Sequence, residues 1–341
     1  MDNIDLSKYQ LRTDLAIETL DKETNKGIKT NEEVIDNIKI STIDVLESDF
    51  INKKIGRYLT IEFDDITDSN NKDKVKNIFS DQLRNFIKYM NINDKASCLI
   101  VGLGNDLSTP DSLGPLSIDK IIVTKHLFSL GEVSSGFRNV SAISPGVMGT
   151  TGIETSDLII GIVNSTKPDF VIIIDALASS SLSRINKTIQ ITNTGIHPGS
   201  GVGNSRGEIS RETLNIPVIA IGIPTVVDAV TIVSDTINFM EKQVSYHKKI
   251  INKPKHKLVL PHTVNYKSET NDLNETDKTN LMGIIGTLEE SEVKQLIYEV
   301  LSPLGYNLMV TPKEIDFLIE KLSDIIALGL NNALHRQNNL S

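Results

Sequence analysis

The sequence is poor in the residues and runs that define several classes of protein. It has one cysteine, Cys98, and no tryptophan, and only 5% of its 341 residues are aromatic. A single cysteine excludes an intrachain disulfide framework and favours a reducing compartment. The longest apolar stretch, 216–233, is interrupted by two prolines and Asp228, so it does not predict a membrane span. Because residues 1–10 are charged and lack an apolar core, we expect no signal peptide and a cytoplasmic protein.

An excess of basic residues is also lacking. The chain has 35 Lys and Arg against 44 Asp and Glu, a net charge of -9, and a pI of about 5.3. A protein that clamps nucleic acid needs a basic face, so we expect no direct nucleic-acid partner. The same charge favours encounter with a basic protein. The hydrophobic content of 39% and charged content of 23% are ordinary for a globular chain.

Apolar runs typical of buried strands alternate along the chain with helical patterns. Apolar residues recur at three- and four-residue steps over 75–90, which indicates an amphipathic helix. Continuous apolar strands separated by helices predict an α/β fold, with a mostly parallel sheet covered by helices on both faces. The expected strands are 27–41, 58–63, 98–101, 140–143, 170–175, 185–192 and 216–223, and the expected helices are 75–90, 115–130, 152–166 and 226–240.

The two ends of the chain have a different character from its middle. Residues 1–26 are polar and weakly patterned, which predicts a terminal arm. From about 242 to 280 the chain is rich in Lys, Asn and Thr, so we expect a polar excursion there. Helical patterns at 288–301 and 312–335 then predict C-terminal helices over 288–335. We therefore expect one α/β domain that carries this excursion.

Two aspartates mark the predicted carboxyl ends of parallel strands. Asp111 lies in the loop of VGLGNDLSTPDSLGP, after the run 98–101, and Asp175 ends the run 170–174. In an open α/β sheet this edge exposes the working groups. Asp111 alone is equally well explained as a residue near a helix start. As a pair, two close carboxylates share a proton, so that one can accept a proton from water while the other donates one.

Two further loops follow predicted strands. The stretch SPGVMGTTG, 144–152, could hold an anion through free N–H groups, although an ordinary turn explains it better. The stretch NTGIHPGSGVGNSR, 193–206, contains His197, Gly199 and Arg206. It lacks the complete phosphate motifs, which makes a nucleotide-dependent enzyme the weakest alternative. We expect it to hold backbone close to a substrate chain, with a structural histidine as the other interpretation of His197.

Five segments of the sequence are long and specific: VGLGNDLSTPDSLGP, SAISPGVMGTTGIET, KPDFVIIIDALASSSLSRIN, TIQITNTGIHPGSGVGNSR and IPVIAIGIPTVVDAVTIVSDTI. In this order they resemble the germination protease family of spore-forming bacteria. This resemblance implies endopeptidases that begin the degradation of small acid-soluble spore proteins during germination. It also implies inactive zymogens that process themselves, homotetramers in the spore core, and an α/β fold similar to hydrogenase-maturation proteases. The family's catalytic aspartates fall on Asp111 and Asp175.

The N-terminal arm resembles both the processing site and the substrate site of this family. The stretch Thr13-Asp14-Leu15-Ala16 matches a substrate pattern of Thr-Glu before an apolar residue and Ala, with Asp14 in place of Glu. We expect self-cleavage between Asp14 and Leu15, which divides the chain into a propeptide, 1–14, and a catalytic chain, 15–341. Relatives have an earlier Arg after the second aspartate, whereas this chain keeps only Arg184.

The pattern of Gly102, Gly104 and Asn105 before Asp111 is similar to that of the hydrogenase-maturation proteases. We expect these three residues, with His197, Gly199 and Arg206, to border the substrate groove, and we expect no metal and no cofactor. One alternative is a metal-sensing maturation endopeptidase with ligands at Asp111, Asp175 and His197. Another is a non-enzymatic acidic protein that binds basic spore proteins.

Overall fold

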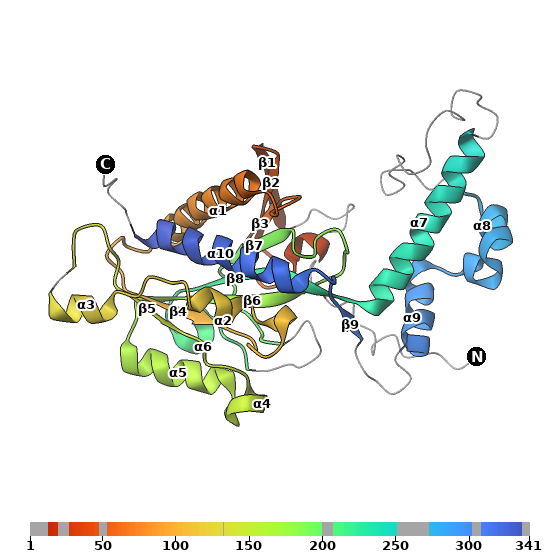
Figure 1. The fold of residues 1–341 in the computed structure, drawn as a ribbon. Coiled ribbons are helices and arrows are strands. Elements are labelled where there is room, and N and C mark those ends of the chain that lie inside the picture. The colour runs from red at the N-terminus through yellow and green to blue at the C-terminus, as the bar shows by residue number, and fades with distance from the viewer. Residues whose placement is uncertain are drawn as a thin grey trace. The chain divides into compact units, whose positions relative to one another are not determined.

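The computed structural model describes residues 13–19, 27–47, 53–131, 133–199, 207–250, 273–301 and 308–335 (Figure 1). The chain forms two compact units. The larger unit comprises Arg12–Val227 and Thr311–Ser341, and the smaller comprises Met1–Leu11 and Asp228–Val310. Every candidate functional residue lies in the larger unit. Within the described residues, no helix is both long and apolar enough to cross a membrane.

The sheet of the larger unit is mixed. Its order is β1-β2-β3-β7-β8-β6-β4-β5. Strands β8, β6, β4 and β5 pair in parallel, and the other pairings are antiparallel. The α/β class is confirmed, but parallel pairing extends over only this half of the sheet. The strands are β1 (Ile28–Ile35), β2 (Ile38–Val45), β3 (Gly56–Glu62), β4 (Cys98–Gly102), β5 (Val140–Ile143), β6 (Phe170–Ser179), β7 (Thr188–Thr192) and β8 (Val218–Asp228).

The antiparallel half begins with a hairpin that the sequence pattern does not reveal. The run 27–41, expected as one strand, is split by a two-residue turn at Asp36 and Asn37, with φ of 51° and 67°. Asn and Asp tolerate this left-handed conformation, which matches the twist of paired strands. So short a connection permits only antiparallel pairing, because parallel strands need a long crossover. The expectation of a mostly parallel sheet is corrected for this physical reason.

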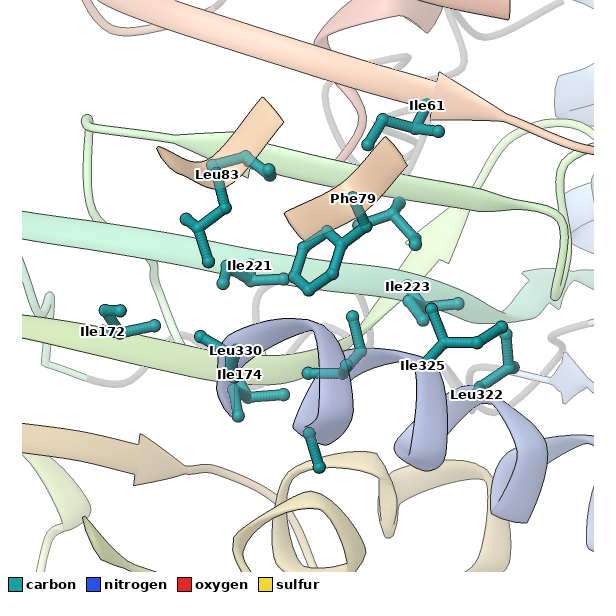
Figure 2. Close-up of a cluster of buried hydrophobic side chains, with 14 of the residues drawn as sticks. Ile61, Phe79, Leu83, Ile172, Ile174, Ile221, Ile223, Leu322, Ile325 and Leu330 are labelled. Atoms are coloured by element: carbon teal, nitrogen blue, oxygen red, sulfur yellow. The ribbon is translucent and has the colours of Figure 1, made fainter. Parts of the chain in front are cut away.

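The strands at the centre of the sheet are apolar because both of their faces are covered. Ile172 and Ile174 of β6 contact one core, whereas Val171 and Ile173 contact the other. The first core packs against α1 (Ser69–Tyr89), α2 (Leu113–Ile118) and α10 (Ile315–Leu334), and the second against α5 (Thr155–Thr166). Figure 2 shows part of the first core, which contains Phe79 of α1 and Leu322 and Leu330 of α10. Alternate side chains of one strand therefore bury opposite faces, as the continuous apolar runs predict.

Most expected helices form, with shifted ends. The helix expected at 115–130 is two short ones, α2 and α3 (Lys125–Leu130), and α4 (Met148–Thr151) precedes α5. Of the excursion expected at 242–280, residues 242–250 belong to α7 (Ala229–Ile250) and residues 275–280 to α8 (Glu275–Met282), whereas 251–272 lie outside the described residues. The remaining elements are α6 (Arg211–Leu214) in the larger unit, and α7 (Ala229–Ile250), α8 (Glu275–Met282), α9 (Glu290–Leu301) and β9 (Met309–Val310) in the smaller.

Candidate active site

The loop after β4 holds Asp111 by close backbone packing. Asp111 ends a short 3-10 helix, Thr109–Asp111, and its Oδ2 accepts a hydrogen bond from the Asn105 N–H at 2.9 Å. Gly104 has φ +116°, and a Cβ there would lie 1.9 Å from the Asp111 carbonyl oxygen. At Gly102 a Cβ would lie 2.4 Å from the carbonyl oxygen of Gly114. Glycine is required because backbone meets backbone at these positions.

Asp175 lies in the middle of β6, which does not end at this aspartate as expected but continues to Ser179. Asp175 is 6% exposed, and its Oδ1 accepts from the Ala176 N–H at 2.9 Å. The Leu103 N–H donates to the Ile174 carbonyl at 2.8 Å, which joins the loop to β6 directly before Asp175. The hydroxyl of Thr225 donates to the Pro110 carbonyl at 2.7 Å and joins β8 to the residue before Asp111. The fold therefore brings the loop that carries Asp111 beside the strand that carries Asp175.

The N-terminal arm lies against the end of β6. The Asp14 N–H donates to the Ala178 carbonyl at 3.1 Å, and the Asp14 carboxylate accepts from the Ala178 N–H at 2.8 Å. Leu15 and Ala16 have no exposed surface, and Ala16 packs against Ile43 and Tyr58. Burial of apolar side chains of this size stabilises docking by about 1–3 kcal/mol each. The predicted cleavage site is thus seated about three residues, or ~10 Å, along the strand from Asp175.

A half-buried lysine and a buried glutamine donate to the carbonyl of the predicted cleavage site. The Lys53 Nζ donates to the Asp14 carbonyl oxygen at 3.1 Å, and the Gln190 Nε2 donates to the same oxygen at 3.1 Å. The Gln190 Oε1 accepts from the Ala16 N–H at 2.7 Å. Burial lowers the pKa of Lys53 below its ordinary value, although the charges of Asp14 and Glu18 act to raise it. These contacts span the peptide bond between Asp14 and Leu15.

A second set of contacts anchors the carboxylate of Glu18, whose side chain is only 2% exposed. Its oxygens accept from the hydroxyl of Ser179 at 2.6 Å, and from the N–H and hydroxyl of Ser180 at 2.7 and 2.8 Å. Arg184 lies 3.4 Å from this carboxylate and also pairs with Glu62 at 2.9 Å. Charge-assisted hydrogen bonds of this kind are the stronger ones in proteins. Arg184 therefore holds the arm that docks beyond the second aspartate.

The other predicted groove residues lie on the loop after β7. The His197 Nε2 is 3.6 Å from the Glu208 carboxylate, which also pairs with Lys54. Gly199 has φ +73°, and Arg206 lies outside the described residues. Among the residues that the structure describes, no group of three or more His, Cys, Asp or Glu side chains is arranged to hold a metal ion. Roles for these residues in binding remain predictions.

Sequence reasoning missed Lys53 and Gln190. Gln190 carries a weak signal, because it is a polar residue in the middle of the strand pattern TIQIT and is 5% exposed. A polar side chain buried in a strand needs a hydrogen-bond partner. Lys53 carries no such signal, since it lies in a polar stretch of ordinary composition. Only the folded chain brings it to Asp14.

The fold and this site describe an α/β protein with two carboxylates beside a docked stretch of its own chain. The family model for germination proteases matches residues 8–341. A germination protease from Bacillus mycoides is 53% identical, over 98% of this chain and 96% of the relative. One from a Geobacillus species is 51% identical over the same shares. The chain belongs to the germination protease family and is therefore a peptidase, a hydrolase of peptide bonds.

A solved structure was also found to be similar in part. It is a NiFe hydrogenase maturation protease from Thermococcus kodakarensis, 21% identical, with a TM-score of 0.27. The match covers 38% of this chain and 75% of that one.

Proposed function

We propose that this chain is the zymogen of an aspartate-dependent endopeptidase that cuts itself between Asp14 and Leu15. In its processed form it would begin the degradation of small acid-soluble spore proteins. The observation that carries the proposal is the position of the arm: Asp14 is docked on β6 at Ala178, beyond Asp175, and Ile174 of the same strand accepts a hydrogen bond from the loop that leads to Asp111. A tethered chain docked ~10 Å from a catalytic carboxylate reaches it by a local movement rather than by diffusional encounter.

The proposed reaction uses Asp111 and Asp175 as a general base and a general acid. The ionised carboxylate takes a proton from water, whose oxygen attacks the carbonyl carbon of Asp14. The protonated carboxylate then gives its proton to the Leu15 nitrogen as the C–N bond breaks. The products are the Asp14 carboxyl group and the Leu15 amine, so that atoms and charge balance.

The negative net charge of the chain and its hydrogen bonds to the main chain of the arm support basic proteins as substrates. The net charge of -9 favours encounter with basic proteins. Because Lys53 and Gln190 contact the main chain of the arm, another extended chain can make the same hydrogen bonds. Assembly as a homotetramer in the spore core is part of the same proposal and follows from the family resemblance.

Incubation of the purified full-length chain at mildly acidic pH, followed by N-terminal sequencing, tests the proposal. The parent should gain Leu15 as its new N-terminus. Asp111→Asn and Asp175→Asn should each slow this cut by about 10²–10⁴-fold while the circular dichroism spectrum is unchanged. The control is Asp106→Asn, which alters an exposed carboxylate of the same loop and should process normally. Normal processing in both aspartate variants would refute the assignment.

Two further reactions separate the alternatives. The processed chain should degrade a small basic spore protein, whereas a mere binding protein would hold it stoichiometrically and leave it intact. The same reaction should continue in the presence of a chelator. Its complete arrest, with recovery on adding a metal, would instead favour the metal-dependent mechanism.

A further inference from the structure

We propose that Lys53 and Gln190 form the oxyanion-stabilising pair of this protease, which binds the carbonyl oxygen of the bond to be cut. The inference rests on the proposed self-cleavage between Asp14 and Leu15. It assigns to two residues outside the aspartate pair a direct part in the reaction, since both contact the oxygen on which negative charge would develop.

Lys53 supplies a positive charge to this oxygen. Its Nζ lies 3.2 Å from the Thr13 carbonyl oxygen and 3.1 Å from that of Asp14. One ammonium group thus bridges two successive carbonyls on the amino side of the bond. The ammonium is half-buried, and an electrostatic contact is worth more where water is excluded. Burial lowers the pKa of Lys53, with the facing charges of Asp14 and Glu18 acting in the opposite direction.

Gln190 supplies a fixed neutral donor. Its backbone pairs with Thr60 of β3 on one side and Gly222 of β8 on the other, so its position is set by the centre of the sheet. The side-chain amide donates to the Asp14 carbonyl oxygen at 3.1 Å and accepts from the Ala16 N–H at 2.7 Å. It therefore binds the chain on both sides of the bond. Both amide atoms have a partner of the right kind, which fixes the orientation of the amide.

The sheet register places Gln190 in one row with the second aspartate. Asp175 pairs with Gly222, and Gly222 pairs with Gln190. Residues paired across neighbouring strands project from the same face, so Asp175 and Gln190 project from one face, with their backbones about two strand spacings, or ~10 Å, apart. The residue between them is Gly222, and the side chain of Leu177 packs over it, since a Cβ there would lie 2.5 Å from that side chain. A peptide held by Gln190 therefore lies on the face that carries Asp175, with Leu177 between the two.

Lys53 and Gln190 would act on the negative charge that forms on the Asp14 carbonyl oxygen during the reaction. When water adds to the Asp14 carbonyl carbon, the electron pair of the C=O bond moves onto the oxygen. The hydrogen bonds from Lys53 and Gln190 strengthen as this charge forms, which lowers the barrier. When the C–N bond breaks, the C=O bond forms again and the nitrogen leaves with its proton. Lys53 and Gln190 keep their own protons throughout.

Four variants of the full-length chain test the inference by the rate at which the Leu15 N-terminus forms. Lys53→Met removes the charge, and Gln190→Glu removes the donor while keeping an acceptor for the Ala16 N–H. Each should slow the cut by about 10²–10³-fold. Lys53→Arg restores a donor and should recover most of the rate. Lys54→Met changes the neighbouring lysine, which pairs with Glu208, and should cut at the parent rate.

Two measurements distinguish a chemical role from arm docking. Hydrogen exchange of the Ala16 amide reports docking, and it should stay as protected in Gln190→Glu as in the parent. Lys53→Arg should keep the pH–rate profile of the parent, because the protonated member of the aspartate pair sets the loss of rate at higher pH and arginine stays charged throughout. A cutting parent whose Lys53→Met and Gln190→Glu variants cut equally fast overturns this inference alone. A parent that never cuts itself contradicts the proposed function instead.

Discussion

At the scale of single residues, the glycines of the Asp111 loop have a different task from the one that their sequence suggests. Gly102 and Gly104 remain predicted groove residues, because the pattern that contains them is similar to that of the hydrogenase-maturation proteases. In the structure their missing side chains admit the backbone of Gly114 and Asp111. The same absence of Cβ atoms lets the loop fold back on itself, and this folding fixes where Asp111 stands.

Gly104→Ala should therefore destabilise the protein and slow the cut. The new Cβ would lie 1.9 Å from the Asp111 carbonyl oxygen, in a backbone with φ +116° that alanine avoids. We expect the free energy of unfolding to fall by at least about 1–3 kcal/mol, measured by urea denaturation. Gly149→Ala is the matched control, because a Cβ there meets nothing within 4 Å. Equal stability of the two variants would contradict the packing role of Gly104.

At the scale of elements, the arm is held at two separate points. Its main chain is bound by Lys53 and Gln190, while Glu18 is bound by two serines and Arg184. The second point uses the side chain and so depends on sequence. It fixes the register of the arm, because a shift by one residue would take the carboxylate away from its donors.

Glu18→Ala should loosen the arm without unfolding the sheet. Loss of this buried carboxylate removes hydrogen bonds from Ser179 and Ser180 and leaves Arg184 with Glu62. We expect protection of the Ala16 amide from hydrogen exchange to fall by about 1–3 kcal/mol in free energy. The exposed Glu47→Ala is the control and should leave this protection intact. Unchanged protection in Glu18→Ala would show that the main-chain contacts hold the arm by themselves.

The C-terminal end of α10 carries a pH-sensitive contact. His335 is 2% exposed. Its Nδ1 accepts from the Arg138 N–H at 3.3 Å, and its Nε2 lies 3.2 Å from the Ile122 carbonyl. Burial, together with the charge of Arg138, lowers the pKa of His335 despite the Ile122 hydrogen bond. The neutral ring satisfies both contacts, whereas protonation would turn the acceptor Nδ1 into a second donor facing an N–H.

Stability should consequently rise with pH near this histidine. With a folded pKa below the unfolded value of about 6.5, the unfolded chain binds more protons in the window between the two. The contribution of His335 is present above that unfolded value and is lost as pH falls through the lowered one. Urea midpoints at about pH 5 and pH 7.5 should differ less in His335→Gln than in the parent. Equal differences in the two proteins would contradict this origin of the slope.

At the scale of the whole molecule, sequence patterns predicted the helices and strands themselves better than they predicted which strands pair with one another. The α/β class, the helix α1 and the apolar strands β4 and β6 follow from local periodicity. The insertion of β7 between β3 and β8 does not, because it joins residues far apart in the chain. Short turns and edge strands have no apolar run that would identify their partner.

The candidate site likewise contains residues that a local sequence pattern indicates and residues that depend on contacts between distant parts of the chain. Asp111 and Asp175 could be proposed from the sequence because each follows a recognisable apolar run, and a carboxylate in that position is unusual enough to notice. Lys53 and Gln190 could not, since they reach Asp14 across 39 and 176 residues of sequence. Their role depends on the docked arm, and no local pattern records which buried strand residue faces a segment so distant.

The complete burial of Leu15 has a consequence for the direction of the proposed cut. Hydrolysis turns one neutral amide into two ions, a carboxylate at Asp14 and an ammonium at Leu15. The carboxylate forms beside the Lys53 cation, whereas the ammonium forms in a place without exposed surface. An ion buried in this way costs several kcal/mol. The new amino end is therefore driven out into water and away from its former partner. Religation would need both charged ends to return to their buried positions, so the proposed cut would be irreversible in each molecule.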